Sequence, residues 1–178
     1  MKTLNQYIKE KLIINQRFDE KLIINKDYKG AKIVVKSFDE LRKIIEDRYD
    51  ELGPGTKQDP IDFNDIDVSN LDSFYTKHKG RFGSGIFQGT QFKYVDISDW
   101  DVSNVKSMRQ MFWLCKELKS IGDISKWNVS KVENMISMFC GCKKFNQDIS
   151  GWNVSNVTNT AFTFDGCPIK EEYKPKFK

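Results

Sequence analysis

Four cysteines and one histidine are the residues best suited to metal or thiol chemistry. Cys140 and Cys142 lie close together, and with Cys115 and Cys167 they would supply four thiolates. Tetrahedral zinc sites favour two-residue gaps between cysteines and often include histidine, and the only histidine is His78. Cys115, Cys142 and Cys167 each follow a phenylalanine by three residues, so we expect them to form one buried column, with Cys140 nearer the surface. We therefore expect no metal site.

Acid–base or nucleophilic catalysis has little support in the sequence. His78 lies in a basic segment with no serine or cysteine in a recognisable catalytic context beside it. The segment GRFGSG at 80–85 lacks the lysine and the serine or threonine of a phosphate-binding loop. Asp96, Asp123 and Asp148 recur once per repeat, which is typical of turn caps rather than of paired catalytic carboxylates. We expect no enzyme, no cofactor and no small-molecule substrate.

Basic and aromatic residues gather in one segment, YTKHKGRFG at 75–83. Arginine and tyrosine are enriched among the residues that dominate protein interfaces. We expect this segment to contact a protein partner through an acidic patch on that partner. A solvated loop without a partner is the alternative. The candidate contact residues are Tyr75, Lys77, His78, Lys79, Arg81 and Phe82, with Asp99, Trp113 and Lys126 as weaker candidates.

A repeat that fills most of the chain must position these residues. Gapless copies cover 96–112, 123–139 and 148–164, and a shorter copy covers 64–74. The tryptophans of the three long copies are in register, at Trp100, Trp127 and Trp152. Their strict period favours a packing role over a ligand-stacking role. The segment 75–83 is an insertion into the first unit, and an insertion carries no stacking duty, so we expect it to project as a loop.

Within each unit the apolar spacing predicts a short helix, a bend and a short strand. In the third unit the apolar residues recur at steps of three and one, at Val132, Met135, Met138 and Phe139. Ser130 is the expected N-cap of that helix. Such a unit cannot bury its apolar side alone, so the copies must stack. The sequence therefore predicts a solenoid with a parallel sheet on one face.

The run MFCGCKKFNQDISGWNVSNV at 138–157 resembles the repeat of the BspA-like leucine-rich repeat proteins. The resemblance covers about residues 61–166. It implies an α/β fold, a short right-handed leucine-rich-repeat solenoid of four units of about 25 residues with an N-terminal strand–helix cap. It also implies a role in binding or adhesion, usually on exported bacterial surface proteins. The lysine-rich leader followed by a strand, a helix and NDIDVSN is similar to small repeat proteins of large tailed phages.

The chain divides into four expected parts. They are a leader with an amphipathic helix at 1–26, a strand–helix cap at 27–60, the repeats at 61–166 and a C-terminal tail at 167–178. The run AKIVVK at 31–36 predicts a strand, and Ser37 with Glu40 predicts a capping box for a helix that GPG ends. Thr160 and Thr163 replace the paired methionines of earlier units, so we expect the last unit to face solvent.

The composition is that of a globular protein, with 39% hydrophobic residues and a net charge of +4 over 178 residues. Residues 61–166 carry 12 basic and 12 acidic residues, which argues against a nucleic-acid partner. No apolar run approaches the roughly 20 residues that span a bilayer. Charges at 9–11 interrupt any signal-peptide core. We expect a cytoplasmic or virion location, with no signal peptide, no transmembrane segment and no membrane contact.

These observations favour a non-catalytic protein–protein interaction module over other classes of function. The second hypothesis is a structural or packaged component of a phage particle, docked through its N-terminal leader. The third is a bacterial surface adhesion protein.

Overall fold

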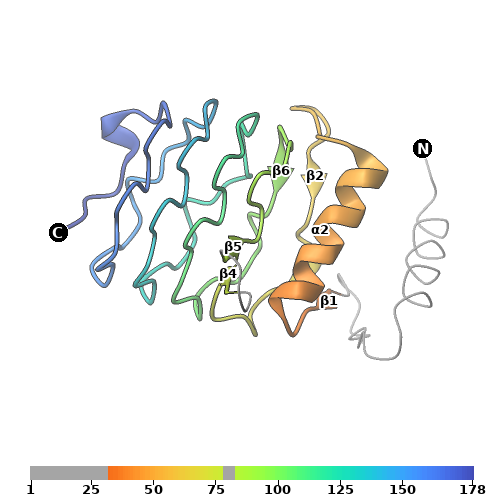
Figure 1. Ribbon diagram of the computed structural model, residues 1–178, viewed down its shortest axis with the longest axis horizontal. Helices are drawn as coiled ribbons and strands as arrows, with labels where there is room; N and C mark the ends of the chain where they lie inside the picture. The colour runs from red at the N-terminus through yellow and green to blue at the C-terminus, as the bar shows by residue number, and fades with distance from the viewer. Residues whose placement is uncertain (1–31, 78–82) are drawn as a thin grey trace.

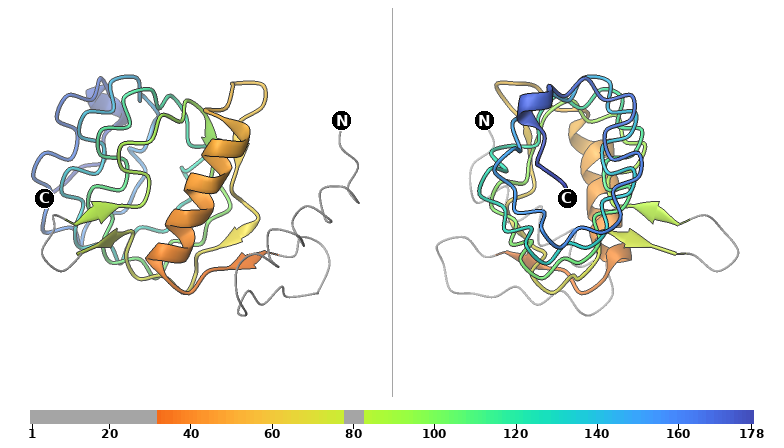
Figure 2. Two further views of the ribbon diagram at one scale, coloured as in Figure 1. Left: turned by 45° about the vertical axis from the view of Figure 1, so that its right-hand side comes forward. Right: turned by 90° about the vertical axis from the view of Figure 1, so that its left-hand side faces the viewer.

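The structure is a computed structural model that describes residues 32–77 and 83–178 (Figure 1). The described residues contain a single α-helix, α2 (Phe38–Leu52), and a 3-10 helix, η1 (Glu171–Tyr173). Their six strands are two residues long each: β1 (Ile33–Val34), β2 (Ile61–Asp62), β3 (Ile66–Asp67), β4 (Tyr75–Thr76), β5 (Ser84–Gly85) and β6 (Val95–Asp96). The repeats lie side by side as similar irregular loops, with α2 towards one end and the C-terminus at the other (Figures 1 and 2).

The strands form three two-stranded sheets. β1 pairs with β3 and β2 pairs with β6, both in parallel, and β4 pairs with β5 as an antiparallel hairpin. Isolated parallel bridges then link each repeat to the next, from Ser73 to Ser107, Asn134 and Asn159. Neighbouring repeats are thus joined by backbone hydrogen bonds without forming a continuous sheet.

The predicted α/β leucine-rich-repeat solenoid is wrong. Val132 to Phe139, expected as a helix, are turns and a single bridge residue, and Ile149 to Val154, expected as a strand, are turns and irregular backbone. The helix α2 lies before the repeats, and the repeats among the described residues contain no helix apart from η1 after the last copy. The fold is therefore irregular, with short β pairings, rather than a solenoid of helices and a parallel sheet.

Tight turns explain why the spacing of three was misleading. The N–H groups of Met138, Cys140 and Cys142 each donate to the carbonyl three residues earlier, so consecutive turns bring every third side chain inward. Ser137 and Gly141 have φ of 55° and 74°. A right-handed helix excludes such left-handed residues. Turns of this kind share the i, i+3 spacing of a helix, and the apolar pattern alone cannot separate them.

Like residues of successive repeats stack in the core. The rings of Phe87, Phe112, Phe139 and Phe164 form a column with centroid distances of 5.3, 5.3 and 5.9 Å. The tryptophans of the repeats are buried, as their period predicted. Trp100 donates its indole N–H to the carbonyl of Phe63, and the equivalent Trp152 donates to Ile124. These packing roles of the tryptophans are confirmed.

The helix before the repeats follows its sequence signals. The Ser37 side chain accepts from the Glu40 N–H at its start, and Gly53, with φ of 73°, closes it by donating to the Tyr49 carbonyl. Leu41 and Ile45 are fully buried against the first repeat. Leu52, the last residue of α2, is exposed.

The last unit differs from its prediction. Thr163 is buried rather than solvent-facing, and its hydroxyl donates to the carbonyls of Met135 and Thr160. The C-terminal tail covers part of this end, because the Phe177 ring packs 6.4 Å from that of Phe164. The leader at 1–26 lies outside the described residues and stays a prediction.

Candidate partner-binding surface

The predicted contact segment is rooted in the hairpin β4–β5. Figure 2 shows these two strands extending sideways from the repeats. The Tyr75 ring lies under the Arg109 guanidinium, 5.0 Å from ring centroid to Cζ, and Lys77 is exposed. The hairpin base is therefore fixed to the second repeat by a cation–π contact. The remaining candidates, His78, Lys79, Arg81 and Phe82, lie outside the described residues.

The weaker candidates fall in two separate columns of the repeats. Asp99 and Lys126 occupy equivalent positions before the buried tryptophans, and both are exposed. Asp99 donates its N–H to the Asn64 side chain, and its carbonyl accepts from Lys32. Trp113 is half-buried in another column and hydrogen-bonds the Cys140 thiol. The structure does not bring Asp99 and Lys126 together with Trp113.

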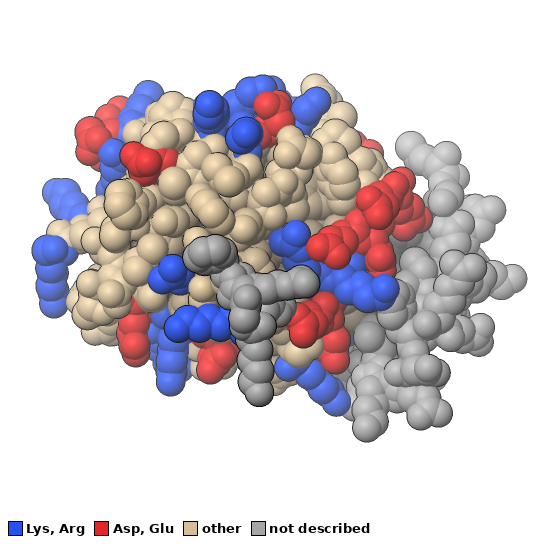
Figure 3. Space-filling view, in the orientation of Figure 1, with Lys and Arg blue, Asp and Glu red and all other residues tan. Residues whose placement is uncertain are grey.

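Trp113 belongs to a wide surface with almost no charge, which we call the uncharged face. It is formed by 109–114, 136–141 and 161–166, where only Arg109 and Asp165 of eighteen residues are charged. Backbone hydrogen bonds hold these three segments next to one another. Figure 3, drawn from the side on which α2 and the hairpin lie, shows a broad area free of charge between charged margins. Among the described residues, large exposed hydrophobic side chains are Leu114, Phe162 and, outside this face, Leu52.

Leu114 holds a backbone conformation that suits glycine. Its φ is 59°, and the equivalent positions in the other units are Gly89, Gly141 and Gly166, all at positive φ. A left-handed leucine costs about 1–2 kcal/mol, and its side chain is 38% exposed. It lies over Gly141, where an added Cβ would come within 2.8 Å of its Cδ2. An exposed apolar side chain kept at a strained position points to a role outside the fold.

Two polar atoms at the foot of the hairpin lack a hydrogen-bond partner. The Nε of Arg109 and the Oε1 of Gln110 are buried and make no hydrogen bond within the described structure. Buried polar atoms are nearly always paired, so each exception calls for an explanation. Both residues lie beside the hairpin, since the Arg109 guanidinium lies over the Tyr75 ring and the Gln110 carbonyl lies next to Gly85.

Sequence reasoning missed Leu114 and Phe162, which are the most exposed large apolar residues of the uncharged face. Leu114 had a readable signal, because it stands where three aligned units have glycine. Phe162 had none, since an extra aromatic in the last copy reads as core. Its φ of 58° and its 68% exposure become evident only in the structure.

Two of the four cysteines are buried as protonated thiols. All four are free thiols, and the described residues contain no cluster of three or more metal-ligating side chains. Burial raises the pKa of Cys115 to about 11 and raises the pKa of Cys142 still further, so both stay protonated at neutral pH. Each donates its S–H to a carbonyl of the preceding unit, that of Phe87 or Phe112. The predicted inward column of cysteines is confirmed for these two residues, and its third member, Cys167, is only half-buried. Cys140 is half-buried, as expected.

The aspartates that recur once per unit are turn residues. The carboxylate of Asp123 accepts the N–H and the hydroxyl of Ser125, and Asp148 accepts the N–H of Ser150. These hydrogen bonds lower the pKa of both aspartates. Burial raises the pKa of Asp96, but its hydrogen bonds from Ser98 outweigh burial and leave it below its usual value. The predicted role as turn caps is confirmed.

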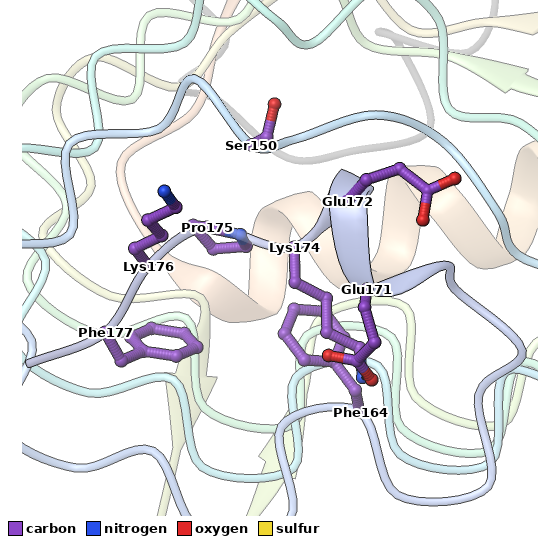
Figure 4. Close-up of a pocket in the computed structure, with 8 residues that line it drawn as sticks. All are labelled: Ser150, Phe164, Glu171, Glu172, Lys174, Pro175, Lys176 and Phe177. Carbon is purple, nitrogen blue, oxygen red and sulfur yellow. The ribbon is translucent and has the colours of Figure 1, made fainter.

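A shallow cleft of about 350 Å³ lies at the C-terminal end (Figure 4). Phe164 and Phe177 form its apolar wall, and Glu171, Glu172 and Lys174 supply charge. Lys174 pairs with Glu171 and lies over the Phe164 ring. Lys174 is therefore not a free cation, although Lys176 also lines the cleft.

The protein is thus built of side-by-side sequence repeats. A helix covers one end of the repeats, and one surface of the repeats is almost uncharged. The chain belongs to the family described as Mycoplasma protein of unknown function, DUF285, whose model matches residues 62–172. No curated protein and no solved structure matches it. Across residues 32–77 and 83–178, no helix has the length and apolar character needed to cross a membrane.

Proposed function

We propose that the protein is a non-catalytic protein–protein interaction module whose contact surface is the uncharged face together with the foot of the hairpin β4–β5. Leu114 carries the proposal, because this leucine costs backbone strain where the other units have glycine and still leaves 38% of its side chain exposed.

The partner's chemistry follows from the surface. An apolar, nearly uncharged area suits the buried centre of an interface, and charges belong at its rim. Lys77 and Arg109 stand at the rim beside the hairpin. A protein that presents an apolar patch bordered by carboxylates fits both parts. The four free thiols suit a reducing compartment, so we place the contact inside the cell or a virion.

The test is a quantitative affinity capture with matched variants. Wild type, Leu114→Gly and the control Leu52→Ser are immobilised and exposed to an extract of the cells that encode the protein. We expect a protein retained by wild type and by Leu52→Ser but at least tenfold less by Leu114→Gly. Leu114→Gly relieves the strained φ, so its free energy of unfolding should change by less than about 1 kcal/mol.

Binding of the captured protein is then measured by calorimetry with purified components. Lys77→Glu should weaken the affinity, and added salt should weaken the wild-type affinity, because the expected partner surface is acidic. If the captured protein binds Leu114→Gly as tightly as wild type, the uncharged face is not the contact and the proposal fails.

A further inference from the structure

In the second and third units, four peptide groups each point along the row of repeats. In the third unit their carbonyls accept from the second unit, and their N–H groups donate to the fourth. The N–H donors are Met135, Ser137, Phe139 and Gly141, and the acceptors in the fourth unit are Asn159, Ala161, Thr163 and Asp165. The second unit donates in the same way through Met108, Gln110, Phe112 and Leu114. These hydrogen bonds form parallel chains of aligned peptide dipoles, which polarise one another.

The carbonyl end of these chains is closed by a cation. At the first unit, Nη1 of Arg42 in α2 donates to the carbonyls of Ile86 and Gln88, at 2.8 and 3.4 Å, and to that of Gly85 at 3.2 Å. A guanidinium is the complement of the negative end of aligned peptide dipoles. Arg42 therefore satisfies the carbonyl end of two chains, those that run through the N–H groups of Phe87 and Gly89.

The opposite end presents only donors. The N–H groups of Thr160, Phe162, Phe164 and Gly166 are equivalent to the donors of earlier units, and none of them has a hydrogen-bond partner within residues 32–77 and 83–178. The left-handed backbone at Phe162 and Gly166, with φ of 58° and 63°, keeps these N–H groups on one side. Successive N–H groups arranged in this way attract anions and carbonyl oxygens. We call these four groups the donor row.

The C-terminal tail covers the ring column but not the donor row. Phe177 packs on Phe164 as the phenylalanine of a further unit would, and Lys174 lies over the same ring (Figure 4). The tail reaches residues 160–166 through one printed hydrogen bond, from the Cys167 N–H to the Phe164 carbonyl, and its other bonds to the repeats reach Phe145, Asn146 and Ile149. None of these bonds uses an N–H of the donor row. In the neighbouring column, the Thr158 N–H donates back to the Glu133 carbonyl of the third unit, so the direction of donation is reversed. The donor row therefore begins at Thr160.

We propose that the donor row at residues 160–166 binds an acidic peptide segment of a partner protein, whose main-chain carbonyl and carboxylate oxygens accept from its four N–H groups. The row spans seven residues, which matches an extended peptide better than one small anion. A second copy fits poorly. Two donor rows facing each other offer no acceptor, and the carbonyls of the first unit already bind Arg42. Phe162, 68% exposed beside the row, offers an apolar contact for the same peptide.

This inference deepens the proposed function, because it names a second contact and the chemistry of its occupant. It is tested on the purified full chain with a synthetic peptide of alternating glutamate and glycine, ten residues long, followed by ¹⁵N-edited NMR. A peptide with lysine in place of glutamate is the matched probe. Ala161→Glu places a carboxylate in the row, while Gly151→Glu adds the same charge in the last unit where an added side chain meets open space.

We expect the glutamate peptide to shift the amide signals of Thr160, Phe162, Phe164 and Gly166, and the lysine peptide to leave them unchanged. Ala161→Glu should weaken the affinity at least tenfold, and Gly151→Glu should have little effect. Leu114→Gly should bind the peptide with wild-type affinity. A failure of peptide binding at the donor row and a failure of partner binding at Leu114 are therefore separate results. No shift overturns the proposal. So do equal shifts with inorganic phosphate, or concentration-dependent broadening of these amides without peptide, which would assign the row to a small anion or a second copy.

Discussion

At the scale of single residues, the cysteine column shows how a small side chain joins two repeats. Cys142 is fully buried, and its S–H donates to the Phe112 carbonyl of the preceding unit. Cys115 makes the same contact with Phe87. In this position the thiol is both a small apolar group and a weak donor.

We predict that Cys142→Ser lowers the free energy of unfolding by about 1–3 kcal/mol, because the shorter hydroxyl loses packing and leaves acceptor capacity buried without a partner. Urea denaturation measures the change. Cys140→Ser is the control at a half-buried site and should stay within about 0.5 kcal/mol of wild type. Equal effects of the two variants, or unfolding of wild type by a metal chelator, would contradict the packing role.

The residues that stack were predictable from the sequence, because stacking places chemically equal positions over each other and leaves a strict period. Trp100, Trp127 and Trp152 carried this signal. Surface residues such as Phe162 give no periodic signal in the sequence, since their exposure depends on the direction of the backbone. The uncharged face therefore emerged only from the three-dimensional arrangement.

At the scale of elements, the helix α2 packs against one end of the repeats and covers it. Its capping residues and apolar face were readable from the sequence because they act locally. The role of Arg42 was not readable, since its acceptors lie more than forty residues away. Inside the repeats, turns and helices share the same spacing, so the predicted helices were wrong although the buried positions were right.

We predict that Arg42→Met destabilises the protein by about 1.5–3 kcal/mol, the range for hydrogen bonds to a charged group, because the Ile86 and Gln88 carbonyls lose their donor. Lys57→Met removes an equal charge from an exposed site and should stay within about 0.5 kcal/mol of wild type. Amide hydrogen exchange should also quicken at Phe87 and Gly89, which lie in the same peptide chains. Unchanged stability and exchange would remove Arg42 from its capping role.

At the scale of the whole molecule, the same turn with an aspartate or asparagine recurs in successive units. Asp101 accepts the Ser103 N–H, and the equivalent Asn128 and Asn153 accept the serine N–H in the same way. The same turn is therefore built with and without a titratable group. Where aspartate is used, its hydrogen bonds tie the stability of the repeats to pH.

Protonation of three turn aspartates should lower the stability of the fold in acid. Hydrogen bonds from the following serine hold the pKa values of Asp123 and Asp148 below their usual range, and those from Ser98 outweigh burial at Asp96. A folded pKa below the unfolded value of about 3.9 adds stability that is fully present above that value and is lost as pH falls through the folded pKa.

Thermal melting should therefore show a nearly constant midpoint from pH 7 to about 5 and a falling midpoint below about pH 4. A variant with asparagine at 96, 123 and 148 keeps the turns, as Asn128 does, but has no carboxylate to protonate at these sites. Its midpoint at neutral pH should match wild type, and its decline in acid should be shallower. An equally steep decline in the variant would place the acid sensitivity of the fold in other carboxylates.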